Sequence, residues 1–384
     1  MRTQRASVTR TPQTLLAALT CLVVTGSAYT QEPLTLRDMG MFYVGGEVRD
    51  TAGFEQHVGQ ALVHYLVPET DRPGPPVVMY PGLGLSSYIY LSTPDGREGW
   101  AQAFARRGFS AYVYDPVNTG PSGFAVGPFR SADEPAPGVN TWSIGQIWRR
   151  WGFGDAPGEP YADARFPTDH MDQFYASWPP RVGGGGGGMG GAGGGGMAAA
   201  ANGGGMAAGG GAAMGAGGRG AGGGGAMGAG GQAAGGGLPP VESNNPNVLA
   251  LEALLQRTGP AVLMPHSAGG PVIFNTARRN PDLVSAIVVL EPTGCPTAAG
   301  DVESIAHIPF LAVYGDYIES RNQTGRLESC RATAALVREM GGRGEMLELT
   351  EQGIRGNSHM LMQDDNSADI AARVMDWLES LESQ

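Results

Sequence analysis

Apolar and polar positions follow two different patterns along the chain. Short apolar runs such as "VVMY" at 77–80 and "AVLM" at 261–264 indicate buried strands. Segments such as 324–341 have apolar positions three or four residues apart, which indicates amphipathic helices. The two kinds of segment alternate, so they predict an α/β fold with a mostly parallel central sheet and helices on both faces. The expected strands are 42–47, 61–67, 77–80, 109–116, 261–267, 284–292, 308–316 and 345–351, and the expected helices are 96–108, 247–259, 268–280, 324–341 and 364–383.

The α/β pattern stops for more than a hundred residues in the middle of the chain. Residues 121–182 are rich in Pro, Trp, Phe and Tyr, which predicts an inserted cap that lines a site. Residues 183–237 are a Gly/Ala/Met tract that cannot bury enough apolar surface to offset its chain entropy, so we expect a disordered loop. The α/β core is then expected at 29–120 and 241–384.

The first residues have the pattern of a secretory signal peptide. Arginines precede an apolar stretch from Leu15 to Val24, and the small residues Gly26-Ser27-Ala28 follow it. The stretch is too short to span a membrane. We therefore expect residues 1–28 to be a leader that is cleaved after Ala28, and the mature protein to be secreted or periplasmic without a membrane anchor.

The composition excludes several kinds of partner and catalytic group. The formal net charge of −11 argues against a nucleic-acid partner or an anionic lipid surface. The chain contains no lysine, which excludes Schiff-base lysines, Ser-Lys dyads and the P-loop lysine. Cys295 and Cys330 remain after leader removal, and both buried thiols and a disulfide fit this pair. No cysteine pair has zinc-ligand spacing, and no cofactor is expected.

The stretch "PHSAGG" at 265–270 lies between an expected strand and an expected helix. Such a turn is either a helix start capped by Ser267 or a nucleophile elbow that holds Ser267 out of the sheet for attack. Gly269 is the small residue that a tight elbow requires, whereas Pro265 stands where an elbow usually has glycine. Haloalkane dehalogenase chemistry is disfavoured because it needs an aspartate in place of Ser267.

A serine nucleophile needs a base and an acid that orients the base. His359 lies in a loop between the last expected strand and the last expected helix, where hydrolases of this order carry their histidine. Glu291 and Asp316 end two consecutive strands at the carboxyl edge of the sheet, and the residues alone leave both open as the acid. Glu291 ends the more apolar strand, where an unpaired carboxylate is costly.

The oxyanion that forms during attack needs hydrogen-bond donors that are already in position. The backbone N–H of Ala268, directly after Ser267, is the first candidate. The second is the N–H of Leu83, where Gly82 and Gly84 would let the backbone approach a substrate oxygen.

The segments "YPGLG", "TPDGREGW", "PHSAGG", "VVLEP" and "GNSHM" together resemble the α/β-hydrolase superfamily. More narrowly, they resemble bacterial secreted or periplasmic esterases with a Ser-Glu-His triad. That resemblance covers most of 40–130 and 245–380, and it implies Ser267 as nucleophile, Glu291 as acid and His359 as base. The sequence departs from the family at "YPG", where His-Gly is usual, and at Pro265.

These features together predict a secreted serine hydrolase that cleaves carboxylic esters through an acyl-enzyme. The alternative is a non-catalytic binding protein of the same fold, although such a protein would not need to keep Ser267, Glu291 and His359. The expected partner is a small-molecule ester, and a homodimer is the one assembly left open.

Overall fold

The computed structural model describes residues 32–51, 54–70, 74–124, 139–182 and 244–382. The chain divides into two units, Met1–Pro33 and Leu34–Gln384, and all the described helices and strands lie in the second. The expected leader, the 183–237 tract and part of the expected cap lie outside the described residues. Among the described residues, no helix has both the length and the apolar character needed to cross a membrane.

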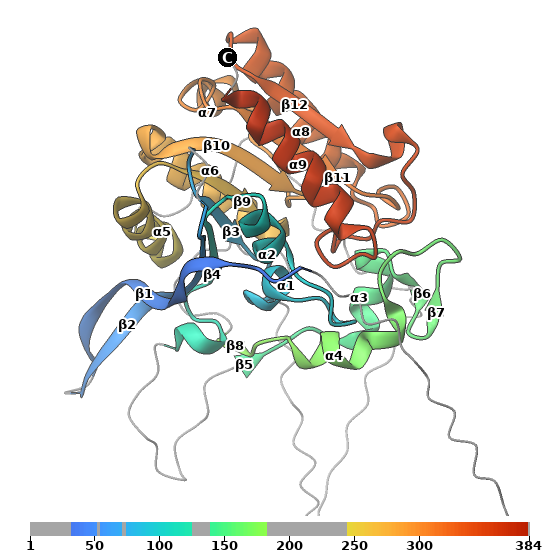
Figure 1. The fold of residues 1–384 in the computed structure, drawn as a ribbon, viewed down its shortest axis with the longest axis horizontal. Helices are drawn as coiled ribbons and strands as arrows, with labels where there is room; N and C mark the ends of the chain where they lie inside the picture. The colour runs from blue at the N-terminus through green and yellow to red at the C-terminus, as the bar shows by residue number, and fades with distance from the viewer. Residues whose placement is uncertain (1–31, 52–53, 71–73, 125–138, 183–243, 383–384) are drawn as a thin grey trace, which may run out of the picture. The chain divides into compact units, whose positions relative to one another are not determined.

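The second unit is built on an eight-stranded mixed sheet with the order β1-β2-β4-β3-β9-β10-β11-β12 (Figure 1). β1 pairs antiparallel with β2, and β2 antiparallel with β4, while the remaining neighbours are parallel. The expectation of a mostly parallel sheet is confirmed. The strands are β1 (Leu36–Thr51), β2 (Phe54–Pro68), β3 (Val77–Tyr80), β4 (Ala111–Asp115), β9 (Ala261–Pro265), β10 (Val284–Leu290), β11 (Phe310–Tyr314) and β12 (Gly344–Glu348).

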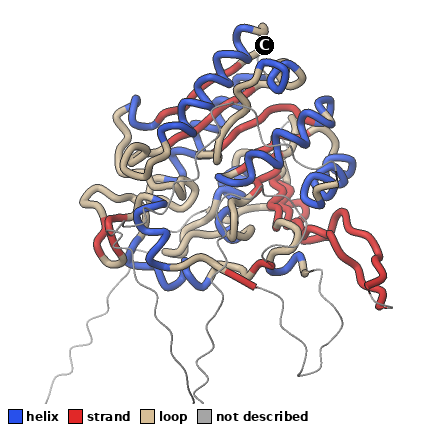
Figure 2. Tube along the Cα trace, turned by 180° about the vertical axis from the view of Figure 1, so that it is seen from behind, coloured by secondary structure: helices blue, strands red, loops and turns tan. Residues whose placement is uncertain are grey.

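Helices cover both faces of this sheet, as the sequence pattern predicted (Figures 1 and 2). On one face, α2 (Trp100–Arg106) and α9 (Ser367–Leu381) bury apolar side chains such as Trp100 and Phe104. On the other face, α5 (Pro246–Thr258), α6 (Gly270–Arg279) and α8 (Thr324–Glu339) form a second apolar core. The near-continuous apolar character of the central strands follows from burial on both sides.

An inserted segment, residues 139–182, separates β4 from α5. It contains α3 (Ile144–Trp151) and α4 (Met171–Ala176), together with two small two-stranded antiparallel sheets, β5 (Val139–Asn140) with β8 (Arg181–Val182) and β6 (Gly154–Ala156) with β7 (Glu159–Pro160). Buried aromatic side chains of the segment, including Trp151 and Phe174, join the core that contains α2 and α9. Apolar packing therefore fixes this segment against the sheet domain.

A disulfide joins Cys295 and Cys330, with the two Cα atoms 4.8 Å apart. The sequence had left a disulfide and free thiols equally open for this pair. Cys295 lies in the loop after β10, and Cys330 lies in α8. The bond therefore ties α8 to the loop that follows the strand ending next to Glu291.

Candidate active site

Ser267 lies at the turn between β9 and α6, in a short 3-10 turn (Ser267–Gly269). Its φ of +52° is in the left-handed region, which is uncommon for a residue with a side chain and marks functional turns. A Cβ atom at Gly269 would lie 2.6 Å from Cδ1 of Tyr80, so only glycine fits against the strand there. The sequence-predicted strand–turn–helix setting of Ser267 is therefore present.

Glu291 and His359 meet in a hydrogen bond. His359 Nδ1 donates to Glu291 Oε2 at 2.7 Å, and both side chains are buried. Glu291 directly follows β10 and has a φ of +40°, a second left-handed backbone at this edge of the sheet. The backbone N–H of Gly315 donates to Glu291 Oε1 at 2.9 Å, which fixes the carboxylate from the neighbouring strand end.

A buried arginine completes the surroundings of Glu291. Arg321 Nη2 donates to Glu291 Oε2 at 2.6 Å, and the Arg321 side chain has no exposed surface. Burial raises the pKa of Glu291, but the Arg321 charge and the His359 hydrogen bond outweigh burial and bring the pKa to about 2. Glu291 is therefore ionised at neutral pH and can orient the imidazole of His359.

Asp316, the alternative acid, accepts hydrogen bonds from two backbone N–H groups. Its Oδ1 accepts from the Tyr317 N–H at 2.8 Å and its Oδ2 from the Gly356 N–H at 3.1 Å. These bonds fix the turn after β11 to the loop that leads to His359. Among the described residues, Asp316 forms no hydrogen bond with His359, and Glu291 occupies the position next to the ring.

His359 is held from several sides. The His359 backbone N–H donates to the Trp151 carbonyl oxygen at 2.8 Å. Nε2 of His266 lies 2.9 Å from the His359 carbonyl oxygen. A carbonyl only accepts, so His266 Nε2 carries the proton in that contact. Downstream in the same loop, Asp364 accepts from Asn357 Nδ2 at 2.9 Å and from Ser358 Oγ at 2.7 Å, so it joins the residues on both sides of His359. The loop therefore presents the ring in one orientation.

The surroundings favour a neutral His359. Burial lowers its pKa, the Glu291 carboxylate raises it, and the charges of Arg321 and Arg326 lower it again, to about 4. With Nδ1 donating to Glu291, the other ring nitrogen, Nε2, is left to accept a proton. Burial also lowers the pKa of His266 well below its ordinary value, so that ring is neutral too.

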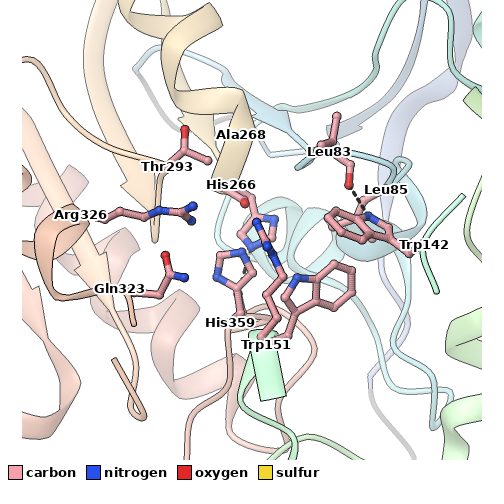
Figure 3. Close-up of a pocket in the computed structure, with 12 residues that line it drawn as sticks. Leu83, Leu85, Trp142, Trp151, His266, Ala268, Thr293, Gln323, Arg326 and His359 are labelled. Carbon is pink, nitrogen blue, oxygen red and sulfur yellow. Dashed lines mark hydrogen bonds between the residues drawn. The ribbon is translucent and has the colours of Figure 1, made fainter. Parts of the chain in front are cut away.

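Ser267 and His359 line the same pocket, a cavity of about 50 Å³ at the carboxyl ends of the strands (Figure 3). Among the described residues, the Ser267 hydroxyl forms no hydrogen bond with His359. Catalytic hydrogen bonds of free enzymes are often long and tighten when substrate binds. The pocket is lined by Leu83, Leu85, Trp142, Arg150, Trp151, His266, Ser267, Ala268, Thr293, Gln323, Arg326 and His359.

Leu83 and Ala268, the expected oxyanion donors, both line this pocket. Within the described part of the chain, neither backbone N–H donates to another group. A Cβ atom at Gly82 would lie 2.9 Å from Cβ of Ser267, so the loop after β3 packs directly against the turn that carries Ser267. The two N–H groups are thus free to donate to an atom in the pocket.

Sequence reasoning did not identify Arg321, Arg326, Arg150, Trp142 or Trp151 as parts of the site. Trp142 Nε1 donates to the Leu83 carbonyl oxygen at 2.7 Å, which joins the inserted segment to the loop after β3. The aromatic richness of 121–182 was the one signal available, and it predicted a pocket lining without naming residues. Among the described residues, no group of three or more His, Cys, Asp or Glu side chains could hold a metal ion.

The strand order, the helices on both faces and the pocket at the carboxyl ends of the strands define an α/β-hydrolase fold. The fold and the superfamily resemblance expected from the sequence are confirmed. A solved structure of a bacterial esterase has a TM-score of 0.70 and 27% sequence identity, covering 91% of this chain and 98% of that chain.

A curated relative supports the same assignment. The probable secreted lipase phiG of a fungal species (strain ATCC 74256) is 23% identical over 426 residues, covering 95% of this chain and 97% of the lipase. No family model matches the chain.

Proposed function

We propose that this protein is a serine hydrolase that cleaves carboxylic esters through an acyl-enzyme, with Ser267 as nucleophile, His359 as base and Glu291 as acid. The observation that carries the proposal is the 2.7 Å hydrogen bond from His359 to Glu291 in the pocket that Ser267 lines. The similarity to a bacterial esterase and to a probable secreted lipase supports an ester as substrate. The left-handed backbone of Ser267 supports its role as nucleophile.

In the proposed reaction, Ser267 Oγ attacks the ester carbonyl carbon while His359 Nε2 takes the hydroxyl proton. The N–H groups of Leu83 and Ala268 stabilise the oxyanion, and Glu291 stabilises the imidazolium. The proton on His359 then passes to the departing alcohol as the carbon–oxygen bond breaks. Water, activated by His359, attacks the acyl-enzyme and releases the acid with Ser267 restored.

Replacement of the nucleophile tests the proposal. Ser267→Ala should lower kcat for p-nitrophenyl acetate by on the order of 10⁵-fold or more, because alanine has no hydroxyl to attack the ester. Ser304→Ala is a matched control, because Ser304 is exposed and does not line the pocket, and this variant should retain wild-type turnover. Circular dichroism spectra of both variants should match the wild type. Wild-type-like turnover by Ser267→Ala would contradict the serine mechanism.

We also propose that residues 1–28 direct export and are removed after Ala28. The leader pattern and the probable secreted lipase among the relatives support this location. The first residue of the exported protein should then be Tyr29, which N-terminal sequencing would detect. A cell-retained product that begins at Met1 would refute the export assignment and leave the chemistry untouched.

A further inference from the structure

Two arginines face the pocket without a carboxylate partner. Arg150 lies in α3 and Arg326 in α8, and both line the cavity beside Ser267. Among the described residues, neither guanidinium forms an ion pair, whereas Arg331 pairs with Glu328 and Glu348. The chain has 36 acidic and 25 basic residues, so carboxylates are plentiful elsewhere. Arg150 is exposed to solvent, but the unmatched charge of the half-buried Arg326 needs an explanation.

Arg326 is half-buried in the first turn of α8, a turn that contains no acidic residue. Figure 3 shows its guanidinium pointing into the pocket, with Thr293 and Gln323 on either side of it. Burial lowers the pKa of Arg326, and the nearby charge of Arg150 lowers it further. The Arg326 charge is thus partly removed from water and lies close to a like charge, a cost that a bound anion would offset.

Arg150 comes from the inserted segment, where it lies in α3. Its guanidinium carbon lies 5.6 Å from the centre of the Trp142 ring, within the range of a cation–π contact. Trp142 in turn is bonded to the Leu83 carbonyl oxygen, next to the proposed oxyanion loop. The aromatic contact therefore orients the Arg150 guanidinium while leaving its N–H groups available for hydrogen bonds.

The carboxylate of Glu291 does not neutralise these two charges. Its Oε2 accepts from Arg321 and His359, and its Oε1 accepts from the Gly315 N–H. Arg321 is the ion-pair partner of Glu291, so Arg150 and Arg326 remain as excess positive charge at the pocket.

We propose that the pocket takes esters that carry a carboxylate close to the scissile bond, and that Arg326 and Arg150 bind this carboxylate. The planar guanidinium matches a carboxylate with two parallel hydrogen bonds, and the charge strengthens each bond. The small cavity favours a short chain, such as the half-ester of a short dicarboxylic acid. This inference rests on the proposed ester hydrolysis and names the substrate class for that site.

Monoethyl glutarate and diethyl glutarate test the inference because they share the reacting ester and differ in charge. With the wild-type protein, kcat/KM should be at least tenfold higher for monoethyl glutarate. In Arg326→Gln and in Arg150→Gln, the ratio of the two kcat/KM values should fall roughly tenfold to a hundredfold, the range of a lost charge-assisted hydrogen bond. Arg373→Gln removes the same charge from an exposed position and should leave the ratio unchanged.

The wild-type protein provides a second measurement that does not depend on a variant folding. Free glutarate should inhibit hydrolysis of p-nitrophenyl acetate at least tenfold more strongly than uncharged 1,5-pentanediol, and added salt should weaken the difference.

A wild type that cleaves p-nitrophenyl acetate but prefers diethyl glutarate, or cleaves neither glutarate ester, would overturn the inference and leave the proposed hydrolysis standing. Unchanged ratios in both variants, or equal inhibition by glutarate and pentanediol, would also overturn the inference. A wild type that hydrolyses none of the three esters would instead contradict the proposed function itself.

Discussion

Ser267 and Glu291 both hold left-handed backbones, with φ values of +52° and +40°. A residue with a side chain in this region stores on the order of 1–3 kcal/mol of strain, which the surrounding structure has to offset. Each residue follows a buried parallel strand, β9 or β10, whose hydrogen bonds fix the backbone up to that point. These backbones place Ser267 in the pocket lining and the Glu291 carboxylate against His359, which supports their proposed roles.

The two candidate acids should differ strongly in kinetics. Glu291→Gln should lower kcat by on the order of a thousandfold or more, because an amide cannot stabilise the imidazolium of His359. Asp316→Asn is the matched control, since it also turns a carboxylate at a strand end into an amide. It should cost less than about tenfold, because Asp316 bonds only to turn backbone among the described residues. The reverse ranking would move the acid to Asp316 and remove the narrower Ser-Glu-His assignment.

The charge of Arg321 should affect how kcat/KM depends on pH. His359 must be neutral to accept a proton, so kcat/KM should fall as the pH drops through the His359 pKa of about 4. Arg321→Gln removes a positive charge that disfavours the imidazolium, so the acid limb should move up by about one pH unit or more. Arg331→Gln removes a charge that pairs with Glu348 away from the pocket and should leave the limb in place.

If the acid limb of the kcat/KM profile does not move in Arg321→Gln, and kcat/KM is lowered equally at every pH, Arg321 has only a structural role. A wild-type limb near the ordinary histidine value of about 6.5 would contradict the balance of burial and charge argued for His359.

The elements around His359 are tied together by Arg97, which follows β3 and precedes α2. Its Nη1 donates to the Asp364 carbonyl oxygen at 3.0 Å and to Ser367 Oγ at 3.1 Å, and its Nη2 to the Gln363 carbonyl oxygen at 3.0 Å. Its Nε donates to Asp95 Oδ2 at 2.6 Å. The Arg97 guanidinium thus joins the segment "TPDGREGW" to the loop between His359 and α9.

Arg97→Met should therefore weaken both the fold and the site. Because several carbonyl and carboxylate acceptors lose their donor at once, the free energy of unfolding should fall by about 2–4 kcal/mol. The kcat should fall as well, because the His359 loop loses its anchor. Arg106→Met is the control: its side chain is as exposed as that of Arg97 and pairs with Glu98, and it should cost about 1 kcal/mol or less. Equal costs in urea denaturation would contradict the anchoring role of Arg97.

The sequence predicted the elements well where burial controls the pattern. The apolar runs of β9, β10 and β11 and the amphipathic spacing of α8 were located to within a few residues. The first two strands are longer than expected, at Leu36–Thr51 and Phe54–Pro68, because their far ends pair with each other and alternate apolar with polar residues only weakly.

The positions of Ser267 and His359 were predictable because each follows a recognisable strand, whereas the choice of Glu291 over Asp316 came only from the family resemblance. Arg321 and Arg326 were not predictable, because a polar side chain on a loop or on the outer part of a helix has the same local pattern whether it faces water or a pocket. Their roles depend on contacts between distant segments: α3, α8 and the loop after β3 meet only in the folded molecule. The same holds for Trp142, whose bond to Leu83 spans 59 residues.

In the whole molecule, the apolar cores and the residues of the candidate site lie in different parts of the fold. The sheet and its helices carry the apolar cores, and the carboxyl ends of the strands carry Ser267, Glu291 and His359. The inserted segment adds Trp142, Arg150 and Trp151 to the pocket without a strand of the central sheet. This division predicts that changes in the inserted segment alter substrate preference, whereas changes at the strand ends alter turnover.

Covalent labelling identifies the attacking hydroxyl directly. A fluorophosphonate reacts with an activated serine and forms a stable adduct, so peptide mapping reports which hydroxyl attacks. We expect one adduct per chain, on the peptide that contains Ser267, and no adduct in Ser267→Ala. An unlabelled wild-type protein, or an adduct on a different residue, would contradict the claim that Ser267 is the nucleophile of a serine hydrolase.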